Sequence, residues 1–391
     1  MVEMSAGPQG SELTLAVMAN SRKENENRLA LDPRHLARIP AELRPRIFLE
    51  TGYGASRGYT DEALAEWVGG FGSHDELVAK CDVILQPKPI LADIAELRPN
   101  QVFWGWPHCV QDEELTQVAI DRRLTLIAFE AMNHWNADGS FSLHVFHKNN
   151  ELAGYSSVLH ALQLIGSTGH YGRRLTAAVI GFGATARGAV TALNGLGIND
   201  VDVLTHRGTE AVASPIHSAR VVHFQNNIGI TDPDEQDPAA EPESLASFLA
   251  GHDVIVNCSL QDPTEPMMFL TEDDLAGLAP DTLIIDVSCD TGMGFSWARP
   301  TTFVEPMLTV GDRVAYYAVD HSPSHLWASS TWENSNALLP FIGVVMGGPA
   351  AWDADATISR AIEVRDGEVQ NPAILSFQGR HPGYPHGVLA S

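Results

Sequence analysis

The sequence has little cysteine, little basic charge and no long apolar run. Its four cysteines show no C-x-x-C spacing, so we expect neither a disulfide framework nor a metal site. Only 24 basic residues stand against 49 acidic ones, and a formal charge of -25 argues against nucleic acid as a partner. The first twenty residues contain no Lys or Arg, and the run LTLAVM is too short for a signal peptide or a membrane span. We therefore expect a cytoplasmic protein that does not bind membranes.

The composition that remains is typical of a folded, enzyme-sized protein. Apolar residues make up 44% of the chain and charged residues 19%. A chain of 391 residues is too long for one ordinary core, which predicts two domains. Short apolar runs alternate with amphipathic stretches, and this pattern predicts βα units with parallel strands. The predicted fold class is therefore α/β.

A glycine-rich turn follows a predicted strand in the segment AAVIGFGATARGAV. It has the form G-x-G-x-x-A, in which the glycines let backbone N–H groups and a helix N-terminus approach a pyrophosphate. A lone match is weak and is also found in ordinary turns, but here a strand, a helix and a second strand surround it. We expect a dinucleotide to contact this turn and the end of a later strand, at Gly181, Phe182, Gly183, Ala184, Ala186, Cys258 and Ser259.

The second strand of this unit ends without the acidic residue that usually binds an adenine ribose. Thr205, His206 and Arg207 stand there instead. A carboxylate would repel a 2′-phosphate, whereas a hydroxyl, an imidazole and a guanidinium can all bind it. The sequence therefore favours NADP(H) over NAD(H), with a solvated Arg207 as the alternative.

Four polar residues follow predicted strands in the first half of the chain: Arg28, Lys88, His108 and Glu130. Lys88 is held between two prolines in VILQPKPI. Ligands of open parallel sheets bind beyond the carboxyl ends of the strands, so these residues should share one edge. Each alone could be a solvated or capping side chain. Together they suggest a site that binds a carboxylate and moves protons.

Several segments resemble, in the same order, the superfamily of alanine dehydrogenase, saccharopine dehydrogenase and N5-(carboxyethyl)ornithine synthase. They are ENRLALDP, VILQPKPI, WGWPHC, ELAGYSSVLHAL, GFGATARG, IIDVSCDTG, RPTT and VDHSPS. PHCVQD, DVIVNC and VDHSPS look closest to saccharopine dehydrogenase, whereas LAGYSSVLHAL and the Thr-His-Arg segment are similar to the carboxyethylornithine synthase.

The resemblance implies two Rossmann-like domains with parallel sheets and an active site in the cleft between them. Residues 1–149 and 322–391 would form the substrate domain, and residues 150–321 the NADP-binding domain. By the same resemblance, Lys88 and His108 are the acid/base pair and Asp290 lies beside the nicotinamide and the substrate. The residues implied to bind the substrate are Arg28, Glu130 and His321.

The sequence favours reductive condensation of an amino acid amine with a 2-oxo acid, as in saccharopine or opine formation, or the reverse reaction. Gln86 stands where alanine dehydrogenases have a second lysine, and His321 where they have Asn. Both differences weaken the first alternative, an amino acid dehydrogenase that uses ammonia. The second alternative is a non-catalytic NADP(H)-binding regulator. The expected partners are an amino acid and a 2-oxo acid, and a homo-oligomer is left open.

Overall fold

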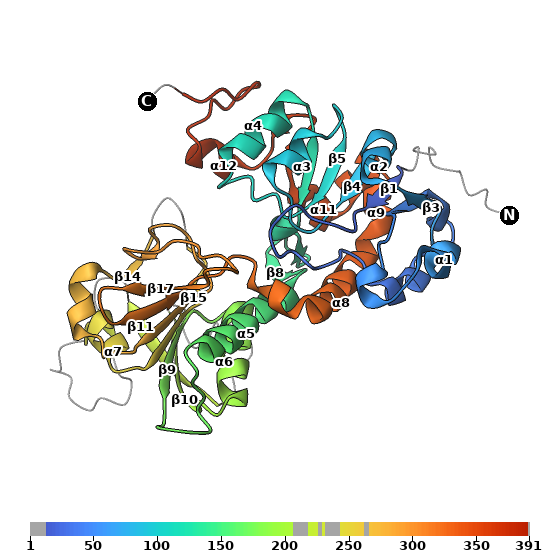
Figure 1. The fold of residues 1–391 in the computed structure, drawn as a ribbon. Helices are drawn as coiled ribbons and strands as arrows, with labels where there is room; N and C mark the ends of the chain where they lie inside the picture. The colour runs from blue at the N-terminus through green and yellow to red at the C-terminus, as the bar shows by residue number, and fades with distance from the viewer. Residues whose placement is uncertain (1–12, 206–217, 226–228, 231–242, 262–265, 390–391) are drawn as a thin grey trace. The chain divides into compact units, whose positions relative to one another are not determined.

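The protein is described by a computed structural model that covers residues 13–205, 218–225, 229–230, 243–261 and 266–389. The chain divides into two compact units (Figure 1). Unit 1 comprises Met1–His147 and Trp327–Ser391, and unit 2 comprises Lys148–Leu326. Each unit is built on a mostly parallel sheet with helices packed on it. The predicted α/β fold with two Rossmann-like domains is confirmed.

The sheet of unit 1 has the order β20-β19-β6-β5-β4-β1-β2-β3, and its six strands from β1 to β6 run parallel. Strand β19, from the C-terminal part of the chain, pairs antiparallel with β6. The strands are β1 Leu15–Val17, β2 Ile47–Glu50, β3 Gly70–Gly72, β4 Val83–Leu85, β5 Val102–Gly105, β6 Thr125–Ala128, β19 Ile362–Arg365 and β20 Glu368–Val369. A separate hairpin is formed by β7 Asn133–Trp135 and β8 Phe141–His144.

Helices of unit 1 connect these strands. The side chain of Asp32 caps the first of them, and that of Thr60 caps α1. The helical stretch after Asp32 is a 3₁₀ helix, Pro33–Arg38. The α-helices are α1 Asp61–Leu64, α2 His74–Lys80, α3 Leu91–Ala95, α4 Glu113–Asp121, α8 Trp327–Leu338, α9 Ile342–Met346, α10 Pro349–Ala354, α11 Ala356–Ala361 and α12 Pro372–Phe377. The other short 3₁₀ helices are η2 Arg44–Arg46, η3 Ala55–Arg57, η4 Ala65–Trp67, η5 Phe129–Ala131 and η9 Leu339–Phe341.

The sheet of unit 2 has the order β12-β11-β10-β9-β13-β15-β18-β17 and is parallel except at its two edges. Its strands are β9 Thr176–Ile180, β10 Asp200–Thr205, β11 Arg220–Gln225, β12 Gly229–Ile230, β13 Val254–Asn257, β15 Leu283–Asp286, β17 Met307–Val310 and β18 Val314–Tyr317. A small second sheet pairs β14 Met268–Leu270 with β16 Gly294–Phe295. The helices are α5 His147–Leu164, α6 Ala184–Gly195, α7 Leu245–Ala250 and the 3₁₀ helices η7 Glu272–Gly277 and η8 Ser322–Leu326.

Two glycines let α5 and α6 cross at backbone contact. A Cβ atom on Gly154 of α5 would lie 2.0 Å from the carbonyl oxygen of Thr185, and one on Gly188 of α6 would lie 1.7 Å from that of Glu151. Figure 1 shows the two helices side by side against the sheet of unit 2. Glycine at both positions therefore fixes where α6, and with it the glycine-rich turn, meets the sheet.

Within the described ranges, none of the helices is both long enough and apolar enough to cross a lipid bilayer. The four cysteines are free thiols, and all but Cys289 are buried.

Candidate active site

Lys88 lies just beyond the carboxyl end of β4, in the bend that its two flanking prolines form. Both prolines are buried, whereas the lysine is half-buried. The hydroxyl of Ser21 donates to the carbonyl oxygen of Lys88 at 2.7 Å, which ties this bend to the loop after β1. The side chain points to the next loop, where its Nζ lies 3.1 Å from Nε2 of His108. The structure thus brings together the two residues that the sequence proposes as an acid/base pair.

His108 follows β5 with a left-handed backbone (φ 50°), a conformation that costs a non-glycine residue about 1 kcal/mol or more. Neighbouring groups stabilise it. The N–H of His108 donates to Oε1 of Glu130 at 2.6 Å. The carbonyl oxygen of Cys109 accepts from the Thr116 hydroxyl at 2.8 Å and from Nε2 of Gln378 at 2.6 Å. The C-terminal segment that carries Gln378 therefore braces the loop on which His108 sits.

Glu130 lies at the carboxyl end of β6, in η5. Its Oε1 accepts from the backbone of His108 and lies 3.8 Å from the imidazole Nδ1. Its Oε2 is buried and has no hydrogen-bond partner within the described residues. Burial first, and then the charge of Glu363, raise the pKa of Glu130 to about 8. Glu130 therefore supports His108, and its raised pKa favours the protonated form.

Arg28 has a carboxylate partner from its own segment. Its Nε donates to Oε1 of Glu26 at 2.8 Å, a second guanidinium nitrogen pairs with Oε2, and the guanidinium lies 4.9 Å from the ring centre of Trp106. Both side chains of the pair are buried. Trp106 in turn donates its backbone N–H to the carbonyl oxygen of Pro87 at 2.8 Å. All four predicted residues of unit 1 are thus joined by contacts along one edge of its sheet.

Two acidic residues of this edge are not singled out by the sequence. Glu26 could have been found from its i, i+2 spacing to Arg28, because two such side chains on an extended segment can pair. Glu363 lies on β19, more than 230 positions after Glu130, and no local signal connects the two.

In unit 2, the glycine-rich turn has the geometry that its sequence predicts. Gly181 has φ 113°, and a Cβ atom there would lie 2.8 Å from the carbonyl oxygen of Cys258. Gly183 is the N-cap of α6, and a Cβ atom there would meet nothing within 4 Å. Ala184 begins α6 and Ala186 is buried in its first turn. Phe182 lies beneath the Arg187 guanidinium, 5.4 Å from it. The turn thus leaves open space in front of a helix N-terminus.

The second strand of this unit, β10, ends at Thr205, which is buried. His206 and Arg207 lie outside the described residues. One of the two acidic residues of β10, Asp202, is bound by Arg220 at 2.8 Å and by His252 at 3.1 Å. It therefore does not replace the missing acid at the end of the strand.

Two strand ends are tied together near the turn. Asn257, the last residue of β13, accepts from the Ser259 hydroxyl at 2.7 Å and donates to Asp286 at 2.9 Å. Asp286 is fully buried and also accepts from the backbone N–H of Cys289 at 3.0 Å. Burial raises the pKa of Asp286 to about 6 and that of Asp290 above its usual value. This network fixes the loop that presents Asp290.

His321 follows β18 with a left-handed backbone (φ 45°). Its side chain is only 5% exposed and packs on the Phe303 ring, at 4.8 Å between centroids. Its Nδ1 lies 3.5 Å from Oδ2 of Asp320. In the described structure the imidazole is therefore a packed side chain of unit 2.

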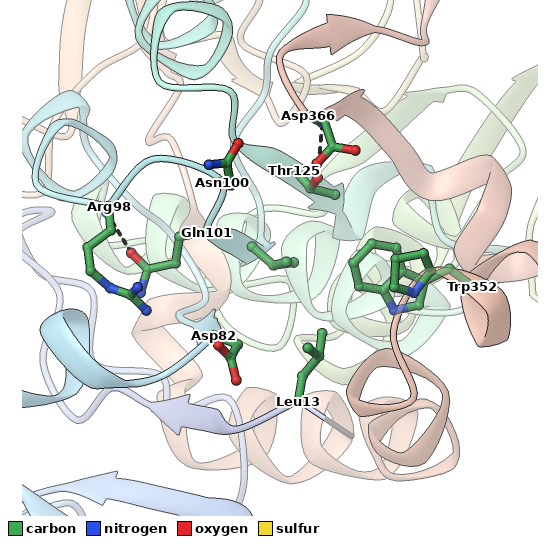
Figure 2. A pocket seen from close by; sticks show the side chains of 10 residues that line it. Leu13, Asp82, Arg98, Asn100, Gln101, Thr125, Trp352 and Asp366 are labelled. Atoms are coloured by element: carbon green, nitrogen blue, oxygen red, sulfur yellow. Dashed lines mark hydrogen bonds between the residues drawn. The ribbon is translucent and has the colours of Figure 1, made fainter. Parts of the chain in front are cut away.

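A pocket of about 190 Å³ opens at the amino ends of the parallel strands of unit 1, opposite to the strand ends that carry Lys88 and His108 (Figure 2). Its lining includes residues before β4 and β5 and after β19, at the amino ends of the parallel strands. Two of its polar side chains are bonded within the protein: Asp82 accepts from Thr14, and Gln101 donates to the carbonyl oxygens of Val78 and Cys81. This pocket is separate from Lys88 and His108.

Two family descriptions match the chain: "Alanine dehydrogenase/PNT, N-terminal domain" over residues 16–153 and "Alanine dehydrogenase/PNT, C-terminal domain" over residues 167–372. The chain is 23% identical to the alanine dehydrogenase of Mycobacterium tuberculosis H37Rv over 387 residues, covering 94% of this chain and 98% of that protein. It is also 23% identical to the alanine dehydrogenase of Lysinibacillus sphaericus, with 91% and 95% covered.

Two solved structures have the same fold. An L-alanine dehydrogenase superposes with a TM-score of 0.72 at 18% identity, covering 93% of this chain and 99% of that one. A transhydrogenase from Sinorhizobium meliloti superposes with a TM-score of 0.67 at 19% identity, covering 92% and 99%. At such identities the likeness concerns the fold.

Proposed function

The chain belongs to the alanine dehydrogenase/PNT family, and from this premise we propose that it is a pyridine-nucleotide-dependent amino acid dehydrogenase. It would convert a 2-oxo acid and ammonia to an amino acid, or catalyse the reverse reaction. Unit 1 would carry the substrate and unit 2 the dinucleotide. The observation that carries this proposal is the 3.1 Å approach of Lys88 Nζ to His108 Nε2.

The two side chains suit the proton transfers of this reaction. Addition of ammonia to a carbonyl and loss of water require a group that gives a proton to the carbonyl oxygen and later takes one back. Lys88 is the half-buried donor, and His108 accepts from it or returns a proton to it. Arg28 is the proposed ligand of the substrate carboxylate, and to bind it the guanidinium would have to exchange its buried pair with Glu26. In unit 2, the proposed role of Asp290 is to lie beside the nicotinamide.

Ammonia is preferred to a second amino acid for two reasons. The relatives that the chain resembles are named alanine dehydrogenases. In addition, Gln86 is buried and donates to Asp93 at 3.2 Å, so its difference from lysine is explained by packing and says little about the substrate. Reductive condensation of an amino acid with a 2-oxo acid stays as the second candidate. It is favoured by His321, an imidazole at a position where an ammonia-using enzyme is expected to have Asn.

The glycine-rich turn fits a dinucleotide. The open space at Gly183 lies in front of the backbone N–H groups that begin α6, where a pyrophosphate would be bound. Phe182, Ala184 and the strand end at Cys258 and Ser259 would complete this surface. When bound, the dinucleotide would supply or accept the hydride. Because β10 ends at Thr205 and not at an acidic residue, we propose a preference for NADP(H).

We expect Gly183→Val to weaken dinucleotide binding by about tenfold or more without loss of stability, since displacing one charged group from a backbone N–H costs about 1.5–3 kcal/mol. Gly195→Val, at the other end of α6, is the matched control, because a Cβ atom there also meets open space. Dissociation constants by calorimetry and melting temperatures would be compared. If both variants bind the dinucleotide like the wild type, the turn is not its binding site.

A direct assay tests the proposed reaction. NADPH and NADH would each be incubated with a panel of 2-oxo acids and either ammonia or a second amino acid, and the products identified by mass spectrometry. We expect oxidation with ammonia, formation of the corresponding amino acid, and faster turnover with NADPH. A product that contains both carbon skeletons would favour the condensation candidate. Absence of oxidation with every pair would contradict the assignment of an enzyme.

A further inference from the structure

Behind His108, the structure places two carboxyl groups that share an unusual feature. Oε2 of Glu130 and Oε2 of Glu363 are both buried, and neither has a hydrogen-bond donor within the described residues. The other oxygen of each is occupied: Glu130 Oε1 by the N–H of His108 at 2.6 Å, and Glu363 Oε1 by Nδ2 of Asn371 at 3.0 Å. If both groups were ionised, two charged carboxylates with a buried, unbonded oxygen would cost several kcal/mol of folding free energy. At least one of the two must therefore be protonated.

The fold brings these two residues together from distant parts of the chain. Glu130 follows β6, and Glu363 lies on β19, which pairs with β6. The pairing is irregular between Ile362 and Val364, at the position of Glu363 itself. The residue is only 5% exposed. Glu363 is therefore shielded from solvent, whereas the side chain of Glu130 is 27% exposed and only its Oε2 is buried.

The charged and titratable groups around Glu130 and Glu363 decide whether the two carboxyls keep a proton. The groups that face it are Lys88 after β4, the backbone of His108 and the thiol of Cys109 after β5, His144 of β8, whose ring contacts the carbonyl oxygen of Glu130 at 3.1 Å, and Asn371 after β20. Burial, followed by the charge of Glu363, raises the pKa of Glu130. Burial also raises the pKa of Glu363. Lys88 is the cation of this set, and it lowers the pKa of Glu130 without overcoming burial.

We propose that Glu130 and Glu363 together hold one proton at neutral pH and act as a proton store for His108. The store begins with one proton and one negative charge. During turnover Lys88 gives a proton to the substrate, and Nε2 of His108 then passes its proton to the amine of Lys88, 3.1 Å away. A carboxyl O–H of Glu130 gives its proton to Nδ1 of His108 once the 3.8 Å between Nδ1 and Oε1 has closed to hydrogen-bond distance. The pair is then doubly negative, and it regains a proton when Lys88 and His108 pass one back.

Glu363 is a positioning residue in this arrangement, because it acts through Glu130 and sets its protonation. The use of the store in catalysis rests on the proposed dehydrogenase function. The existence of the shared proton does not depend on that function, because a shared proton affects the stability of the fold whether or not the chain is an enzyme.

The first test therefore needs no substrate. A carboxyl whose pKa is higher in the folded than in the unfolded chain keeps its proton on folding, so stability falls as pH rises from about 4.3, the unfolded value, through the folded value. We expect the melting temperature of the wild type to fall as pH rises from 5 to 9. Glu363→Gln keeps the acceptor for Asn371 and removes the charge, so its melting temperature should fall less over the same range. Glu130→Gln should flatten the dependence in the same way.

Glu368→Gln is the matched control, because Glu368 lies on the adjacent strand β20 and is exposed. Its melting temperatures should parallel those of the wild type at every pH. Identical pH dependence in Glu363→Gln and the wild type would overturn the shared proton. If Glu363→Gln does not fold, the same comparison with Glu130→Gln decides the question.

The second test concerns the use of the store. In Glu363→Gln, the limb of the pH–kcat profile that falls with rising pH should move to lower pH by about one unit or more, the scale on which one nearby like charge shifts a carboxyl. The KM for the 2-oxo acid should stay within about twofold, because Glu363 does not touch the substrate. Glu363→Gln could show a flatter pH dependence of its melting temperature but an unchanged pH–kcat profile. The two carboxyls would then share a proton that catalysis does not use, and the proposed proton store would be overturned. Failure of the dehydrogenase assignment would appear differently, as absence of turnover in the wild type.

Discussion

Lys88→Met is expected to lower turnover by about 10²-fold or more, the usual scale for loss of a general acid or base. Methionine keeps the apolar stem of the side chain between the two buried prolines but cannot move a proton to or from His108. The variant should still fold and bind the dinucleotide. The hydrogen bond from Ser21 goes to the backbone carbonyl oxygen of residue 88, which the substitution leaves in place. Steady-state kinetics at saturating substrate, together with a melting curve, would measure both effects.

Lys80→Met is a suitable control, because Lys80 is exposed at the end of α2 and should be replaceable without kinetic effect. His108→Ala should resemble Lys88→Met. The double variant should lose less than the product of the two single losses if both residues serve one proton path. Wild-type turnover in Lys88→Met would refute the acid/base assignment despite the family membership.

The second large effect is on stability, and it concerns the buried pair of Arg28 and Glu26. Arg28→Met leaves the Glu26 carboxylate, which is fully buried, without its principal cation. Removing one partner of a buried ion pair costs about 3–5 kcal/mol in the free energy of unfolding. The double variant Glu26→Gln with Arg28→Met should recover much of that loss, because no charge is then left in the interior. Denaturant unfolding of the two single variants, the double variant and the wild type would give the coupling energy.

The chain contains a close match for this arrangement at the surface. Arg34 pairs with Asp32, two residues before it, at 2.9 Å and stacks on Trp332 at 4.6 Å, but its own side chain is 54% exposed. Asp32 also keeps Arg57 as a partner, at 2.7 Å. Arg34→Met should therefore cost only about 0–1 kcal/mol. If Arg28→Met is as stable as the wild type and only raises the KM of the 2-oxo acid, Arg28 is a substrate ligand whose pairing with Glu26 contributes nothing to folding.

The parts of the site that sequence can predict are those with a local cause. An apolar run followed by a single polar residue marks a strand end, and parallel strands bring their ends to one edge, so Lys88, His108 and Glu130 can be grouped from the order of their residues alone. The turn at Gly181 can be identified because only glycine suits its left-handed backbone beside the carbonyl oxygen of Cys258.

What sequence cannot predict depends on contacts between distant segments. The alternation Ile362, Glu363, Val364 is typical of a strand with its glutamate toward solvent, yet Glu363 is buried beside β6 and bonded to Asn371. Gln86 shows a similar limit. Its identity suggests a changed substrate, whereas the structure shows a side chain bonded to Asp93, and neither its burial nor that partner can be read from one sequence.

Strand β19 has a consequence for how the chain is made. Residues 148–326, which form unit 2, are contiguous and leave the ribosome as a complete folding unit. The sheet of unit 1 includes β1, the first strand of the described residues, but receives β19 and β20 only from residues 362–369. Until the last part of the chain is synthesised, β6 is an unpaired edge, open to pairing with another nascent chain. The strand that carries Glu363 therefore closes that edge at the same moment as it completes the surroundings of His108.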